Sequence, residues 1–67
     1  MLTVKDVKKA VKEIKKVSND DEAAHVKEDK LYANILEAIA NGQCEDPAGC
    51  AKAALKTSGL RFARYCA

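Results

Sequence analysis

Hydrophobic residues near the start of the chain recur with the spacing of an amphipathic helix. Four branched apolar residues are separated by three or four positions, so they would form one stripe along a helix. These residues are Val4, Val7, Val11 and Ile14. Thr3 precedes the stripe and forms a capping-box pattern with Asp6, which predicts that the helix begins directly after Thr3.

The opposite side of this expected helix is basic. At 100° per residue, six lysines fall within a sector of roughly 120°. They are Lys5, Lys8, Lys9, Lys12, Lys15 and Lys16. Such a face can be a solvated surface that keeps a small protein soluble, or it can bind an acidic surface of a partner protein. Binding to nucleic acid or anionic lipid is a third interpretation, although arginines and aromatic residues, which strengthen nucleic-acid contacts, are missing among the lysines.

Residues 20–42 carry the strongest helix signal in the chain. Asp20 is a favoured N-cap, and the acidic residues after it lie where the helix dipole stabilises negative charge. Gly42 supplies a left-handed stop, so we expect this helix to run to about Asn41. The apolar side chains of the helix cover an arc of roughly 140°. They are Ala24, Leu31, Tyr32, Ile35, Leu36 and Ile39.

Polar residues interrupt this apolar arc. His25 and Glu28 fall inside it and Asp29 lies at its edge, at spacings that let side chains on a helix meet. Buried carboxylates need a charged or hydrogen-bonding partner, which Arg61 or Arg64 near the C-terminus could supply. We therefore expect a structural polar network here. A partner-binding site and a metal or acid–base site remain as alternatives.

The third helix has an equally clear start. Asp46 is a favoured N-cap and Pro47 suits the first helical position, while residues 57–59 end the helix. The expected inner face consists of Cys50, Ala51, Ala54 and Leu55. Residues 60–67 combine large apolar residues with two arginines, which favours a short helix or a docked turn. The prediction is an all-α fold, a small bundle of three helices plus a short C-terminal helical segment, in one domain of residues 1–67.

The cysteines raise the question of a metal or a disulfide. Cys44, Cys50 and Cys66 together with His25 could hold a zinc ion, but the first two are six residues apart, which is not the tight spacing of a zinc knuckle. We expect free thiols with no metal and no cofactor, and a disulfide or a zinc site are the alternatives. An odd number of cysteines and the lack of a signal-peptide core favour a reducing, cytoplasmic setting.

Size and charge limit the function classes. A chain of 67 residues buries a thin core, and neither an enclosed pocket nor a glycine-rich phosphate loop is expected, so we predict that the protein is not an enzyme. Residues 1–17 carry a net charge of +4 and residues 18–42 of −4. Oppositely charged segments can compensate each other within one fold. No apolar run is long enough to cross a membrane, and a homodimer through the valine stripe or the tail would supplement the thin core.

Parts of the chain resemble a group of known proteins. The string of residues 20–25, the pair Glu28-Asp29 and the helix ending in residues 40–42 are similar to segments of small helical proteins that phages and prophages of actinobacteria encode. The tail of residues 62–67 adds to the likeness. These proteins have no assigned activity, so the resemblance implies a phage context and a cytoplasmic setting, without catalytic residues.

These observations favour a non-enzymatic protein–protein interaction module, with a host or phage protein as its partner. In this hypothesis the six lysines form the partner-binding face, and the protein is a phage-encoded modulator of a host protein. A nucleic-acid-binding accessory protein that uses the same lysines is the first alternative. A small metal-binding module at His25 and the cysteines is the second.

Overall fold

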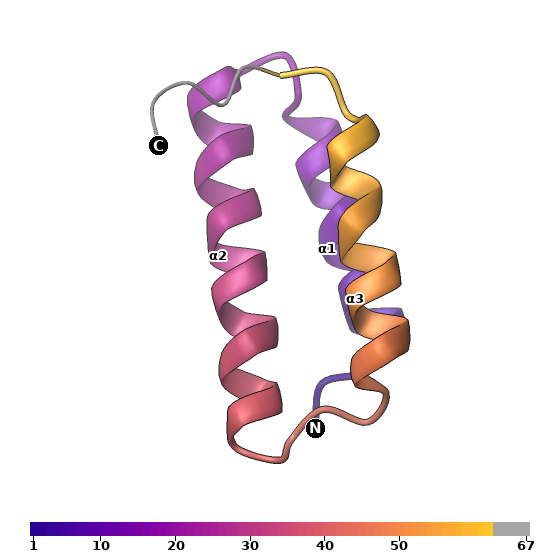
Figure 1. The fold of residues 1–67 in the computed structure, drawn as a ribbon. Helices are drawn as coiled ribbons and strands as arrows, with labels where there is room; N and C mark the ends of the chain where they lie inside the picture. Colours follow the sequence, from indigo (N-terminus) through magenta and orange to yellow (C-terminus); the bar gives the residue numbers. More distant parts are fainter. Residues whose placement is uncertain (63–67) are drawn as a thin grey trace.

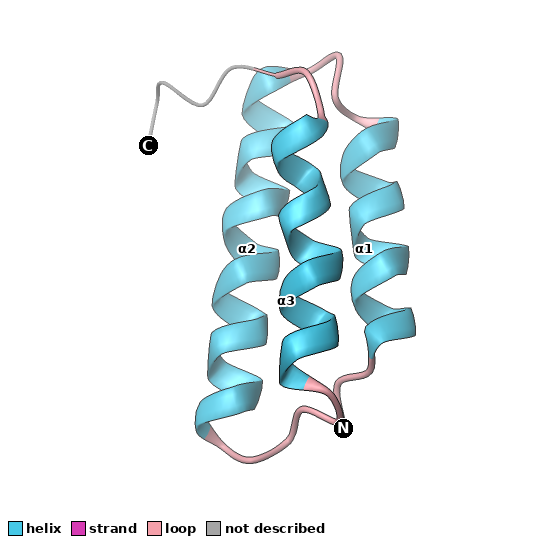
Figure 2. Cartoon of the chain, turned by 45° about the vertical axis from the view of Figure 1, so that its right-hand side comes forward, coloured by secondary structure: helices cyan, strands magenta, loops and turns pink. Residues whose placement is uncertain are grey.

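Three helices lie side by side in the computed structural model, which describes residues 1–62 (Figure 1). They are α1 (Val4–Lys16), α2 (Asp21–Ala40) and α3 (Pro47–Leu55), and a 3-10 helix, η1 (Lys56–Gly59), continues α3. Consecutive helices run in opposite directions, and α3 lies in front of α1 and α2 in Figure 2. The described residues contain no strand beyond an isolated bridge between Leu2 and Cys44. The all-α prediction is therefore confirmed.

The helix boundaries follow from side-chain caps and one glycine. The Thr3 hydroxyl accepts from the Asp6 amide at 3.1 Å and the Asp6 carboxylate accepts from the Thr3 amide at 3.1 Å, which completes the capping box. Asp20 caps α2 and Asp46 caps α3 through their side-chain oxygens. Gly42 follows the end of α2 with a φ of 68°, a conformation that costs a glycine little. The expected starts and stops of the three helices are thus confirmed.

The core is built from one stripe of each helix. The buried apolar residues are Val7, Ile14, Ala24, Leu31, Ile35, Cys50, Ala53, Ala54 and Phe62. The valine stripe of α1 packs against both α2 and α3, and Val7 and Ile14 are 0% and 1% exposed. The expectation that this stripe supplies a dimer interface is therefore wrong, because the single chain already buries it.

The expected inner face of α3 needs correction. Ala51 is exposed and Leu55 is 64% exposed, whereas Ala53 and Thr57 are buried together with Cys50. The buried positions of α3 and η1 are spaced by three and four residues along one stripe, and this stripe points between α1 and α2. An alanine-rich helix offers several apolar stripes, so the sequence did not single out the one that is buried.

The apolar arc of α2 is also narrower than expected. Leu31 and Ile35 are buried, but Leu36 is 67% exposed and Ile39 is 39% exposed. At 3.6 residues per turn, Leu36 lies about 140° around α2 from Leu31 and about 100° from Ile35, at the edge of the side that the other helices cover. Leu36 therefore lies on the rim of the contact between the two helices.

A close approach between α1 and α3 depends on Gly49. A methyl group at this position would lie 2.8 Å from Cγ2 of Val4, and closer still to the carboxylate of Asp46. Cβ atoms do not pack at such distances, so only glycine lets the first turn of α3 approach the start of α1 this closely. The Gly49 amide also donates to the Asp46 carboxylate at 3.0 Å.

The segment expected to form a short C-terminal helix or a docked turn, residues 60–67, is described only over residues 60–62. The short helical segment η1 precedes it, and Leu60 is extended with a ψ of 143°. Thr57 in η1 is fully buried, and its hydroxyl is hydrogen bonded to the hydroxyl of Tyr32 in α2. Phe62 is buried against the core, while residues 63–67 lie outside the described part of the chain.

Candidate functional site

The polar residues of α2 form a pair and a separate buried carboxylate. Nε2 of His25 lies 3.3 Å from Oδ2 of Asp29, one helical turn away. The His25 side chain is 12% exposed and that of Asp29 is 66% exposed, so the pair reaches the protein surface through Asp29. Glu28 is only 4% exposed and takes part in a further interaction within the chain. Among the described residues, no buried side-chain oxygen or nitrogen lacks a hydrogen-bond partner.

The structure describes only one of the two arginines that the sequence analysis assigned to this network. Arg61 is exposed and forms no ion pair with any carboxylate in residues 1–62. Arg64 lies outside the described residues. The structure therefore brings His25 and Asp29 together and buries Glu28 nearby on the same helix, without placing Arg61 among them.

The lysines of α1 all face solvent. The six residues of this basic face are exposed, and they are Lys5, Lys8, Lys9, Lys12, Lys15 and Lys16. Of these six lysines, only Lys16 forms an ion pair with a residue in the described part of the chain. Its partner is Glu13 at 3.6 Å, and both side chains are at least half exposed. Exposed pairs of this kind stabilise a helix by only about 0.3–0.5 kcal/mol. The positive charge of the basic face is therefore largely uncompensated within the fold.

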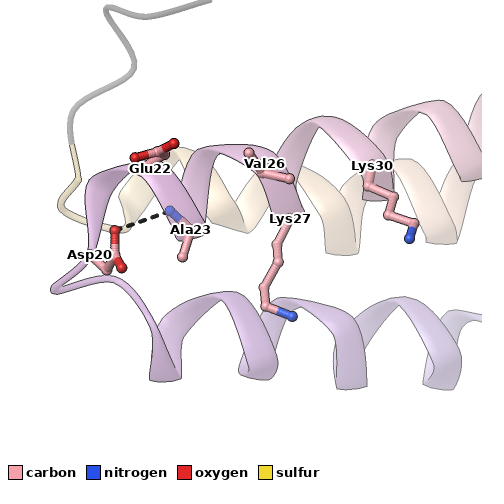
Figure 3. A pocket seen from close by; sticks show the side chains of 6 residues that line it. All are labelled: Asp20, Glu22, Ala23, Val26, Lys27 and Lys30. Carbon is pink, nitrogen blue, oxygen red and sulfur yellow. Dashed lines mark hydrogen bonds between the residues drawn. The ribbon is translucent and has the colours of Figure 1, made fainter.

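A depression of about 490 Å³ lies along the N-terminal half of α2 (Figure 3). Its lining is formed by Asp20, Glu22, Ala23, Val26, Lys27 and Lys30. Figure 3 shows the Lys27 side chain reaching towards the neighbouring helix, while Val26 points to the opposite side of α2. Both signs of charge are present and the depression is open to solvent. These features describe an ordinary surface depression lined by α2 and its N-cap, and they point to no particular ligand.

A second depression, of about 300 Å³, is lined entirely by apolar and aromatic residues of α2 and α3. We call it the apolar groove, and it consists of Tyr32, Ile35, Leu36, Ala51, Ala54 and Leu55. Leu36 and Leu55 on its rim are 67% and 64% exposed. Sequence reasoning assigned these leucines to the core and so missed the groove. Both α2 and α3 carry more apolar positions than contact with one neighbouring helix can bury. This surplus was the sequence signal that could have indicated the groove.

The two described cysteines are close together and free. The thiol of Cys44 donates to Sγ of Cys50 across 3.5 Å, and Cys50 is fully buried. Burial, followed by the interaction with the neighbouring Cys44 thiol, raises the pKa of Cys50 to about 11. His25 lies near the start of α2, and Cys44 follows the far end of this helix, roughly 20 Å away along the helix axis, with Cys50 in contact with Cys44. His25 and these cysteines therefore cannot share a zinc ion.

Residues 1–62 contain no group of three or more His, Cys, Asp or Glu side chains that could hold a metal ion, and Cys66 lies outside this range. None of the helices in the same range combines the length and apolarity that crossing a bilayer requires. The chain matches no family model, no curated protein and no solved structure. The physical features of the basic face, the apolar groove and the cysteine pair therefore guide the functional interpretation.

Proposed function

We propose that this protein is a non-enzymatic, cytoplasmic protein–protein interaction module. Each chain is a three-helix bundle that presents the basic face of α1 to an acidic surface of a partner protein. The observation that carries this proposal is the arrangement of α1 itself. Its apolar stripe is held in the core, with Val7 and Ile14 at 0% and 1% exposure, while its six lysines face solvent on the opposite side.

A fixed basic face suits recognition of an acidic protein surface. Because the core holds α1 in place, the lysines are displayed at set positions along about 20 Å of helix. Complementary charge accelerates encounter and selects partners even where it adds little affinity.

The shape of the surface supports a role without catalysis. The described depressions are open furrows, whereas small-molecule sites enclose most of their ligand. The pair of His25 and Asp29 has the chemistry of a general base, but Asp29 is 66% exposed and the pair lines none of these furrows. The resemblance of residues 18–67 to small phage proteins of actinobacteria makes a host protein the first partner to test.

A charge-reversal experiment tests the proposal. Lys8→Glu/Lys12→Glu reverses two exposed charges one turn apart on the basic face, and Lys52→Glu/Lys56→Glu makes the same change at exposed positions on α3 and η1. A tagged wild-type chain is used to recover a stoichiometric protein from actinobacterial lysate, and the dissociation constant is then measured with both purified proteins. We expect at least a tenfold weakening for the α1 variant and less than threefold for the control. Equal effects of the two variants would refute a specific basic face.

Nucleic-acid binding is the second candidate, and the uncompensated lysines of α1 favour it. If it operates, retention on duplex DNA falls steeply between about 50 and 200 mM salt, because neutralised phosphates release counterions. The same two double variants distinguish specific use of α1 from a general charge effect. Absence of binding at low salt removes this candidate and leaves the protein-partner proposal intact.

We also propose that the protein forms a homodimer in which a second copy covers the apolar groove. The basic face cannot serve this purpose, because two copies of it would repel each other. The groove has no charged side chain in its lining, and its exposed rim leucines, Leu36 and Leu55, lose contact with water when covered. Association of this kind compensates for the small core of a short chain.

A further inference from the structure

Cys44 lies in the segment that holds the N-terminus of the chain. The amide of Leu2 donates to the carbonyl of Gln43 at 2.8 Å, and the amide of Glu45 donates to the carbonyl of Leu2 at 2.9 Å. Cys44 lies between these two hydrogen bonds and forms the isolated bridge with Leu2. A covalent bond at Cys44 would therefore fix the loop after α2, to which the start of the chain is hydrogen bonded.

Cys50 lies on the buried stripe of α3, in direct contact with Cys44. The two sulfur atoms are 3.5 Å apart, and a disulfide needs about 2.05 Å, so an approach of roughly 1.5 Å would join them. Cys44 belongs to a loop rather than to a helix, which lets it make this movement without disturbing helix packing. Cys44 is also partly exposed, whereas Cys50 is completely buried. The two thiols therefore differ in their access to a reagent from solvent.

We propose that Cys44 and Cys50 form a reversible dithiol–disulfide pair that low-molecular-weight disulfides oxidise and that ties the loop after α2 to α3. In the first step the Cys44 thiolate attacks one sulfur of the reagent, forms a mixed disulfide and releases one thiolate, which takes up a proton. In the second step Cys50 loses its proton and attacks the Cys44 sulfur, which forms the intrachain bond and releases the second thiol. Two protein thiols are oxidised, and one small disulfide is reduced to two thiols.

The environment of Cys50 determines how this pair behaves. Because burial raises the pKa of Cys50, to about 11 in the dithiol form, little Cys50 thiolate exists near neutral pH. Closure of the mixed disulfide should therefore be slow at pH 7 and should accelerate close to tenfold per pH unit up to pH 9. In a reducing cytosol the free dithiol is the resting state, and oxidation marks a shift towards disulfide stress.

The experiment uses the full chain with Cys66→Ser, so that only the two thiols of interest remain. The protein is incubated with oxidised glutathione over a range of pH, quenched with acid and analysed by intact mass and peptide mapping. We expect loss of two hydrogen masses, a Cys44–Cys50 linkage, and full return to the dithiol with excess reduced thiol. The linked form should melt about 5–15 °C higher than the reduced form, because the crosslink restricts the unfolded chain.

Single replacements in the same background test the order of the steps. Cys50→Ser should stop at a glutathione adduct on Cys44, and Cys50→Ala, which keeps a small apolar group in the core, should give the same result if the serine disturbs folding. Cys44→Ser should react far more slowly, because Cys50 is buried. Two outcomes overturn the proposal. One is a folded chain that keeps both thiols in excess oxidised glutathione at pH 9, and the other is an adduct on Cys50 that forms as fast as the one on Cys44.

Discussion

Replacement of Gly49 by alanine tests how closely α1 and α3 are packed. A methyl group there would lie 2.8 Å from Cγ2 of Val4 and would displace the Asp46 carboxylate that caps α3. Overpacking of this kind costs about 1–3 kcal/mol, and loss of an N-cap costs about 1 kcal/mol. Alanine recovers about 1 kcal/mol through its higher helix propensity. The net expectation for Gly49→Ala is a loss of about 1–3 kcal/mol.

This loss is large for so short a chain, whose total stability should lie within about 3–10 kcal/mol. Thermal unfolding followed by circular dichroism should show a midpoint roughly 5–20 °C lower than that of the wild type. Gly59→Ala is the matched control. A methyl group at Gly59 meets no atom within 4 Å and the residue has no positive φ, so its midpoint should stay within a few degrees of the wild type.

A double variant separates the clash from the other effects. Val4→Ala removes the atom that a methyl at Gly49 would strike, so the two substitutions together should destabilise the chain by less than the sum of their separate effects. If the two losses of stability are additive, the destabilisation by Gly49→Ala comes from the disturbed Asp46 cap alone and not from the clash with Val4. A Gly49→Ala chain as stable as the Gly59→Ala chain would refute the close approach of α1 and α3.

Three further predictions concern Glu28, the apolar groove and Cys50. Glu28→Ala should destabilise the chain by roughly 3–5 kcal/mol, because it removes the buried side chain and leaves its interaction partner uncompensated. The control Glu37→Ala, at an exposed position, should cost under about 0.5 kcal/mol, and equal urea midpoints for the two variants would contradict the prediction. Leu36→Lys/Leu55→Lys should halve the molecular mass measured by light scattering. The control Val26→Lys changes an exposed apolar position outside the groove and should leave this mass unchanged. A wild-type chain that is monomeric at high concentration would refute the dimer. Because the folded-state pKa of Cys50 is about 11 against an ordinary 9.0, its contribution to stability is full below pH 9 and is lost between pH 9 and 11. Unfolding of Cys50→Ala should depend less on pH in that window.

Local chemistry could be predicted from the sequence because the residues that determine it are neighbours in the chain. The capping box at Thr3, the cap at Asp46 and the left-handed Gly42 each act within a few residues, and all three are present in the structure. The stripe of α1 could be predicted because lysines exclude every other face.

The orientation of α3 could not be predicted for the opposite reason. Its alanines make several stripes nearly equivalent in hydrophobicity, so the choice depends on how a small residue such as Gly49 fits against another helix. Leu36 is exposed because it lies at the edge of the side of α2 that the other helices cover, and the contact between Cys44 and Cys50 follows from the path of a loop. These outcomes depend on tertiary packing, which residue spacing does not encode.

The position of the apolar groove relative to the basic face bears on how the protein would bind a partner. The groove lies between α2 and α3, and α1 packs against both of these helices from the other side with its lysines pointing outward. A second copy in the groove would therefore leave both basic faces uncovered and directed away from the dimer interface. Two linked faces bind a partner that carries two acidic surfaces more tightly than either face alone, because the second contact is intramolecular. On this argument, loss of the dimer through Leu36→Lys/Leu55→Lys should weaken binding to an immobilised, densely packed partner more than binding to the same partner free in solution.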